Sequence, residues 1–111
     1  MVVDDESDIR QAMAEILSSE GFEVVSACDG AEALDKARRY HPELVLLDLM
    51  MPRMNGWEFL SRLRSDPKHH DVPVVVTSAV AAESPRGADA CLQKPFELSQ
   101  LDREVAKLCA H

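Results

Sequence analysis

Short runs of consecutive apolar residues, each ending in a polar residue, constrain this fold more than any other feature of the sequence. Residues 44–47 read Leu-Val-Leu-Leu and residues 74–76 are all valine, with no polar residue at alternate positions. Such runs indicate strands that are covered on both faces, which is typical of parallel sheets. The segments between them have apolar residues at helical spacing. The chain is therefore expected to alternate strands and helices.

Five strands are expected, at residues 1–3, 22–26, 44–47, 73–76 and 90–93. The apolar positions of the intervening helices are Ile9, Ala12, Met13, Ile16 and Leu17, then Ala33, Leu34 and Ala37, then Trp57, Phe59, Leu60 and Leu63, and last Leu98, Leu101, Val105 and Leu108. Ser7 is the expected N-cap of the first helix, and Gly21 its left-handed C-cap. Strands that alternate with helices pair in parallel through right-handed crossovers. The predicted fold is an α/β, doubly wound five-stranded parallel sheet with helices on both faces.

Length and charge limit the functions that this chain can have. Its 111 residues suffice for one domain, so residues 1–111 are expected to form a single domain. The formal net charge is −8, which argues against direct binding of nucleic acid or of an anionic membrane. No apolar run approaches the length of a membrane span, and no secretory signal pattern is present.

The cysteines and the paired histidines do not indicate a metal site. Cys28, Cys91 and Cys109 are odd in number and far apart, with no CxxC spacing. They are expected to be free thiols, which fits a reducing cytoplasm. His69 and His70 lie in a polar segment that contains proline, so a surface loop is expected there.

Charged and hydroxyl side chains follow the predicted strands. They are Asp4, Asp5, Asp48, Thr77, Ser78 and Lys94. The carboxyl ends of parallel strands meet at one edge of a doubly wound sheet, where ligands bind. Three carboxylates that lie close together repel one another, so a lysine and a divalent cation such as Mg²⁺ are the natural partners. Carboxylates, a hydroxyl, a lysine and Mg²⁺ are the components of a phosphoryl-transfer site, and the alternative is a structural cluster of salt bridges.

Four segments of the sequence carry a family resemblance. They are residues 2–5 (Val-Val-Asp-Asp), 46–56, 73–79 and 94–96 (Lys-Pro-Phe), in this order and each at a predicted strand end. With these segments the chain resembles the receiver domain of two-component response regulators, over residues 2–108. The resemblance implies a flavodoxin-like strand order of 2-1-3-4-5. It also implies a cytoplasmic signalling protein that catalyses only its own phosphorylation and dephosphorylation.

The resemblance also implies roles for single residues. Asp48 matches the phosphoacceptor, which takes the phosphoryl group of a partner histidine. Asp5 matches the carboxylate that binds Mg²⁺ directly, and Asp4 the neighbour that helps through water. The backbone carbonyl of Met50 matches a further Mg²⁺ ligand, beside Asp48 itself. Lys94 matches the lysine that pairs with Asp48 and then with a phosphoryl oxygen.

The switch hydroxyl of the family is assigned to Ser78. Ser78 lies five residues after Pro73 and directly precedes Ala79, as the family pattern requires. Because side chains alternate along a strand, only one of Thr77 and Ser78 faces the site, and Thr77 is expected to be core or local support. The bond between Lys94 and Pro95 is expected to be cis in this family.

The sequence departs from the family in the stretch that precedes the last strand. Residues 79–89 contain Pro85 and Gly87 and leave room for a helical turn or two, where the family has a full fourth helix. Cys91 stands where the family has tyrosine or phenylalanine. Met50 and Val80 are apolar and flank the path of an attacking water, which suggests a slow loss of the phosphoryl group.

Alternative functions follow from the same residues. A phosphatase of the haloacid dehalogenase type requires a second aspartate at the position of Met50 and a cap insertion, and both are missing from these residues. A non-phosphorylated pseudo-receiver that acts as a docking module is the stronger alternative. For a working receiver the expected partners are a sensor histidine kinase or histidine phosphotransfer protein, and an effector domain or downstream protein. The chain is expected to be either a stand-alone receiver or a piece of a larger regulator.

Overall fold

A computed structural model of the chain describes residues 1–49, 54–78, 87–94 and 96–108. Five parallel strands form one sheet in the order β2-β1-β3-β4-β5. The strands are β1 (Val2–Val3), β2 (Ser26–Ala27), β3 (Val45–Asp48), β4 (Val74–Ser78) and β5 (Ala90–Gln93). The helices in the described part of the chain are α1 (Ser7–Ser19), α2 (Gly30–Tyr40), α3 (Gly56–Ser65) and α4 (Leu98–Leu108). The doubly wound five-stranded parallel sheet predicted from the sequence is therefore confirmed.

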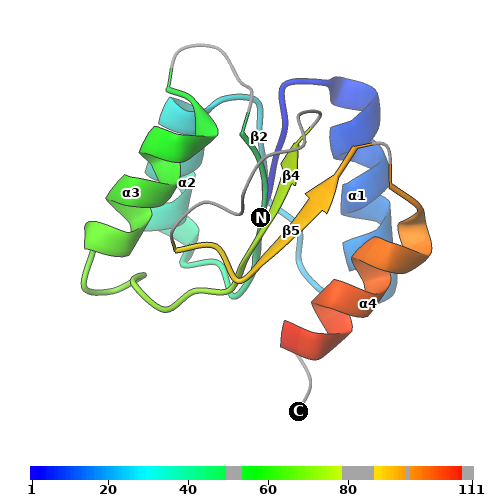
Figure 1. Cartoon of the computed structure of the whole chain (residues 1–111). Helices are drawn as coiled ribbons and strands as arrows, with labels where there is room; N and C mark the ends of the chain where they lie inside the picture. Colours follow the sequence, from blue (N-terminus) through cyan, green and yellow to red (C-terminus); the bar gives the residue numbers. More distant parts are fainter. Residues whose placement is uncertain (50–53, 79–86, 95, 109–111) are drawn as a thin grey trace.

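Helices cover both faces of the sheet, with α2 and α3 on one side and α1 and α4 on the other (Figure 1). The central strands divide their side chains between two apolar clusters. Val3, Leu47 and Val76 pack toward α2 and α3, whereas Leu46 and Val75 pack toward α1 and α4. This alternation explains the unbroken apolar runs, because both faces of each central strand are buried. None of the helices in the described ranges is long and apolar enough to cross a membrane.

The second strand is shorter than the sequence predicted. Residues 22–26 were expected, but β2 consists of Ser26–Ala27 only. The reason is its partner, since β1 offers just Val2–Val3 for pairing and β2 lies at the edge of the sheet. Strand β4, in contrast, continues beyond residue 76 through Ser78, which pairs with Gln93.

The first helix begins differently from the prediction. Glu6 is the N-cap and Ser7 the first helical residue, and no side chain caps this end. Asp4 instead organises the turn, because its Oδ1 accepts a hydrogen bond from the Glu6 amide at 2.9 Å. Gly21 has the predicted left-handed backbone, with φ of 96°. Ala12 is exposed, so its expected place on the apolar face was wrong.

The first residue of helix α3 lies against the end of β3, since the Gly56 amide donates to the Leu49 carbonyl at 3.0 Å. Asn55 caps it by accepting a hydrogen bond from the Glu58 amide at 3.0 Å. A side chain at Gly56 would meet the backbone of Asp48 and Leu49 at 2.6 Å, so only glycine allows this close approach. Trp57 is 46% exposed and lies outside the core, contrary to the expectation from helical spacing.

The histidine pair lies in a loop, as predicted, but one of the two rings is buried. His69 is only 3% exposed. Its Nδ1 is hydrogen-bonded to Asp66 at 3.1 Å, and its Nε2 to Nδ1 of His41 at 3.0 Å. The polar composition of the segment concealed this, because a carboxylate and a second imidazole satisfy both ring nitrogens.

Arg64 of α3 holds the chain segments that enter β4 and β5. Its guanidinium donates to the carbonyls of Gly87 at 2.8 Å and Val72 at 2.6 Å, and to the carboxylate of Asp89 at 3.0 Å. The same Asp89 oxygen accepts from the Val74 amide at 2.8 Å. One arginine thus fixes the end of the shortened stretch 79–89. The helical turns expected within it remain a prediction, because residues 79–86 lie outside the described ranges.

We predict that Arg64→Ala lowers the free energy of unfolding by about 2–3 kcal/mol, because the carbonyls of Val72 and Gly87 and the carboxylate of Asp89 together lose a charged donor that is itself largely buried. Arg62→Ala is the matched control. Arg62 lies on the same helix in an exposed pair with Glu58, so its loss should cost about 0.5 kcal/mol. Urea unfolding of the two variants and the parent measures both values. Equal effects of the two substitutions would contradict the role given to Arg64.

Candidate functional site

The carboxyl edge of the sheet brings the predicted site residues together. Asp4 directly follows β1, Asp48 ends β3, Ser78 ends β4, and Lys94 directly follows β5. Asp4, Asp48 and Ser78 are all nearly inaccessible, at 0%, 3% and 2% exposed. Charged groups at such depth require partners.

Lys94 supplies positive charge to the buried acids of this edge. Its Nζ lies 3.0 Å from Oδ2 of Asp4 and 3.5 Å from Oδ2 of Asp48. The pairing with Asp48 expected from the sequence is therefore present, but the shorter contact is to Asp4. Burial alone would lower the pKa of Lys94, yet the hydrogen bond to Asp4 and the charges of Asp4 and Asp48 outweigh it and raise that pKa. The ammonium is thus held in its charged form.

An acidic group at the start of α1 has the chemistry of a cation site. Carboxylate oxygens of Asp4, Asp5 and Glu6 lie within 4.8 Å of one another. Hard oxygen donors of this kind suit Mg²⁺, and Asp5 and Glu6 are exposed and open to solvent. Sequence reasoning missed Glu6, although it directly follows the two aspartates. Glu6 does not follow a strand directly, so the rule of strand ends did not select it. The turn that Asp4 stabilises places the Glu6 carboxylate next to those of Asp4 and Asp5.

Some predicted residues lie outside the described ranges. They are Met50, whose carbonyl was expected to bind Mg²⁺, Val80, Pro95 and Cys109. The expectations for them remain predictions. Cys28 and Cys91 are free, half-buried thiols, as the sequence suggested. Cys91 packs against the apolar cluster under α2 and α3.

The hydroxyls of Thr77 and Ser78 occupy different environments. Thr77 is fully buried, and its Oγ1 has no hydrogen-bond partner among the described residues. The Ser78 carbonyl accepts a hydrogen bond from the Lys94 amide at 2.6 Å. The backbone of the expected switch residue is thereby joined to the residue that carries the site's cation.

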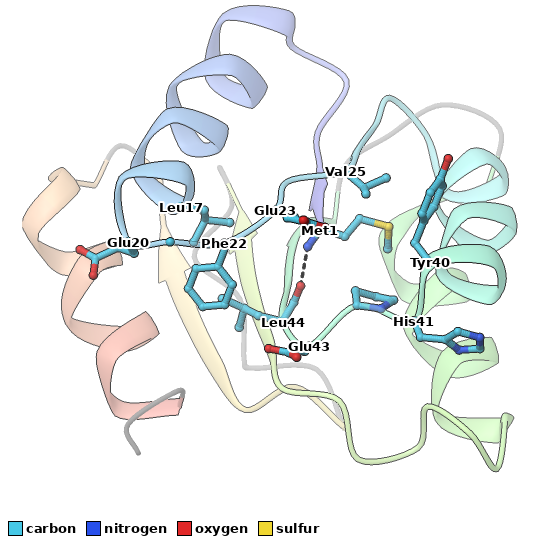
Figure 2. A pocket seen from close by; sticks show the side chains of 12 residues that line it. Met1, Leu17, Glu20, Phe22, Glu23, Val25, Tyr40, His41, Glu43 and Leu44 are labelled. Atoms are coloured by element: carbon cyan, nitrogen blue, oxygen red, sulfur yellow. Dashed lines mark hydrogen bonds between the residues drawn. The ribbon is translucent and has the colours of Figure 1, made fainter.

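A pocket of about 460 Å³ lies at the opposite edge of the sheet (Figure 2). Met1, Leu17, Phe22, Tyr40 and Leu44 are among the residues that line it. The amino group of Met1 donates to the Leu44 carbonyl there at 2.6 Å. None of the acids of the carboxyl edge lines this pocket, so it belongs to a different part of the molecule.

The family model of the response regulator receiver domain matches residues 1–106. The chain belongs to this family. It is 40% identical over 111 residues to a probable transcriptional regulator, ycf27, of Porphyridium aerugineum, covering 95% of this chain and 45% of the relative. The chain spans about half the length of the curated relatives it matches.

Solved receiver structures share the fold. The response regulator TrrA of Thermotoga maritima, in complex with Mg²⁺ and beryllium fluoride, is 35% identical, with a TM-score of 0.86 over 96% of this chain and 95% of that one. CheY in the CheX–CheY–BeF₃–Mg²⁺ complex of Borrelia burgdorferi is 28% identical, with a TM-score of 0.88 over 99% and 87%. Both neighbours share the architecture of this receiver domain.

We predict that Asp4→Asn lowers the pKa of Lys94, because the penalty of burial stays while the strongest favourable interaction is lost. A raised pKa stabilises the parent fold at pH values below the ordinary lysine range, and this contribution is lost as the pH rises through the raised pKa. An NMR titration of the Lys94 side chain measures the change.

Glu6→Gln is the control for this titration, because Glu6 contributes least among the groups that raise the pKa of Lys94. The control should leave the titration of Lys94 nearly unchanged. A pKa of Lys94 that stays at the parent value in Asp4→Asn would contradict the dominant role of Asp4.

Proposed function

We propose that this receiver domain, residues 1–111, takes a phosphoryl group from a histidine kinase or a histidine phosphotransfer protein onto Asp48. The observation that supports this most strongly is the position of the Lys94 ammonium between Asp4 and Asp48. The solvent-exposed carboxylates of Asp5 and Glu6 lie next to Asp4. A structural cluster of salt bridges would not require exposed acids next to a buried carboxylate. The reducing cytoplasm indicated by the free cysteines remains a prediction.

In the proposed reaction an oxygen of Asp48 attacks the phosphorus of the partner's phosphohistidine. The N–P bond breaks, its electron pair stays on the histidine nitrogen, and an acyl phosphate forms on Asp48. Negative charge on the transferring group is stabilised by preorganised positive charge, which Lys94 supplies. Asp4, Asp5, Asp48 and the Met50 carbonyl would hold Mg²⁺, which supplies further positive charge for the phosphoryl oxygens. The domain thus promotes only its own phosphorylation and dephosphorylation.

The proposed switch begins at Ser78. A phosphoryl group on Asp48 adds negative charge and strong acceptor oxygens, to which the Ser78 hydroxyl donates. Ser78 pairs with Gln93, and its carbonyl accepts from the Lys94 amide. A displacement of Ser78 therefore passes through the backbone to β5, which does not require an aromatic residue at Cys91. An effector domain or a downstream protein then reads the altered surface.

We predict that incubation with acetyl phosphate and Mg²⁺ adds the mass of one phosphoryl group to the parent and none to Asp48→Asn. Intact-mass spectrometry measures this directly. Parent protein that binds Mg²⁺ but gains no mass would contradict the proposal and favour a pseudo-receiver that docks without phosphorylation. Steady hydrolysis of small phosphate esters would instead indicate a phosphatase.

A second prediction concerns the path of the conformational change. Beryllium fluoride with Mg²⁺ should shift the amide resonances of Ala90–Gln93 in the parent, because Ser78 pulls on β5. In Ser78→Ala these shifts should be lost, while shifts next to Asp48 remain. Heteronuclear NMR spectra of both proteins measure the difference. Equal β5 shifts in the two proteins would rule out Ser78 as the origin of the change.

A further inference from the structure

Thr77 is a buried polar side chain without a partner. Its Oγ1 is the one buried side-chain nitrogen or oxygen in the described ranges that makes no hydrogen bond. The three residues before it in β4 are valines, and a valine has nearly the same shape as threonine. An unsatisfied buried hydroxyl destabilises a fold relative to an apolar side chain of that shape. The hydroxyl of Thr77 is therefore not explained by folding and requires another role.

The register of the sheet places Thr77 beside the phosphoacceptor. Thr77 pairs with Asp48 on one side and with Leu92 on the other. Side chains two residues apart along a strand share a face. Thr77 therefore lies on the face of Val75, and Asp48 on the face of Leu46, both toward α1 and α4. The two side chains are direct neighbours in one row across the sheet.

The side chain of Lys94 reaches an acid of this row, Asp48. Lys94 follows β5, and β4 separates β5 from β3 in the sheet. Nevertheless, the Lys94 ammonium reaches Asp48 at the end of β3 and Asp4 beyond it, at 3.5 Å and 3.0 Å. Its path from β5 to these acids passes over β4, whose residue in this row is Thr77.

The hydrogen-bonding capacities of the two side chains are complementary. A lysine ammonium has three N–H donors, and in the described ranges two carboxylates, those of Asp4 and Asp48, contact it. Among the described residues, neither the third N–H donor of Lys94 nor the hydroxyl oxygen of Thr77 has a hydrogen-bond partner. A phosphoryl group on Asp48 would add acceptor oxygens that attract the ammonium away from Asp4 on β1 and toward β3.

We propose that Thr77 is a positioning residue for Lys94. Its hydroxyl oxygen accepts the third N–H of the ammonium as Lys94 moves from Asp4 toward the phosphoryl group on Asp48. This role rests on the proposed function of Asp48. The Thr77 hydroxyl thereby holds the end of the flexible Lys94 side chain at the point where negative charge develops on the transferring phosphoryl group.

Two substitutions of Thr77 separate this role from packing. Thr77→Val keeps the shape and removes the hydroxyl, whereas Thr77→Ser keeps the hydroxyl and removes the methyl group. We expect the thermal midpoint to follow the order valine, threonine, serine, from highest to lowest. We expect phosphorylation by acetyl phosphate with Mg²⁺ to be slowed roughly ten-fold in Thr77→Val and to return close to the parent rate in Thr77→Ser.

The two readouts change in opposite directions, so a loss of rate in the more stable variant cannot result from unfolding. If the parent is phosphorylated and Thr77→Val reacts at the parent rate, the role of Thr77 is overturned while the proposed function stands. Equal slowing in both variants would also overturn it, because the missing methyl group would then matter as much as the hydroxyl. A parent that takes no phosphoryl group would overturn the role together with the proposed function.

Discussion

Two carboxylates, those of Asp4 and Asp48, are buried side by side at the carboxyl edge of a parallel sheet, and the structure depends on the cation between them. Unpaired charges at such depth destabilise a fold by several kcal/mol. Lys94 supplies the positive charge from the far side of β4. Its reach requires β5 to be paired with β4 in the observed register, and β1 to lie next to β3. The ion pairs of the site therefore depend on the strand order of the sheet.

The start of β5 helps to position the lysine of the site. The position of Lys94 depends on how β5 begins, and Asp89 fixes that beginning through the Val74 amide and the Arg64 guanidinium. Arg64 of α3 thereby anchors the chain directly before β5. Gly56 acts on the other side of the site, because it lets α3 start against the backbone of Asp48.

Much of this arrangement could be predicted from the sequence. The apolar runs that end in Asp4, Asp48, Ser78 and Lys94 were sufficient to predict the fold and the edge at which these residues meet. Strand pattern could not predict the bounds of β2, because they depend on the two residues that β1 offers for pairing. Nor could composition predict the burial of His69, which depends on hydrogen bonds to Asp66 and to His41, a residue distant in the sequence. The sequence likewise could not predict that Lys94 lies closer to Asp4 than to Asp48, because these distances depend on the three-dimensional arrangement of the strands.

The binding of Mg²⁺ to the acidic edge tests most directly whether this arrangement is a working site. Calorimetric titration of the parent with Mg²⁺ should show one bound ion, and Asp5→Asn should abolish this binding. Glu15→Gln is the matched control, since Glu15 is an exposed acid of α1 away from the edge, and it should bind as the parent does. A parent that binds no Mg²⁺, or an Asp5→Asn variant that binds it as tightly as the parent, would contradict a cation-assisted phosphoryl site.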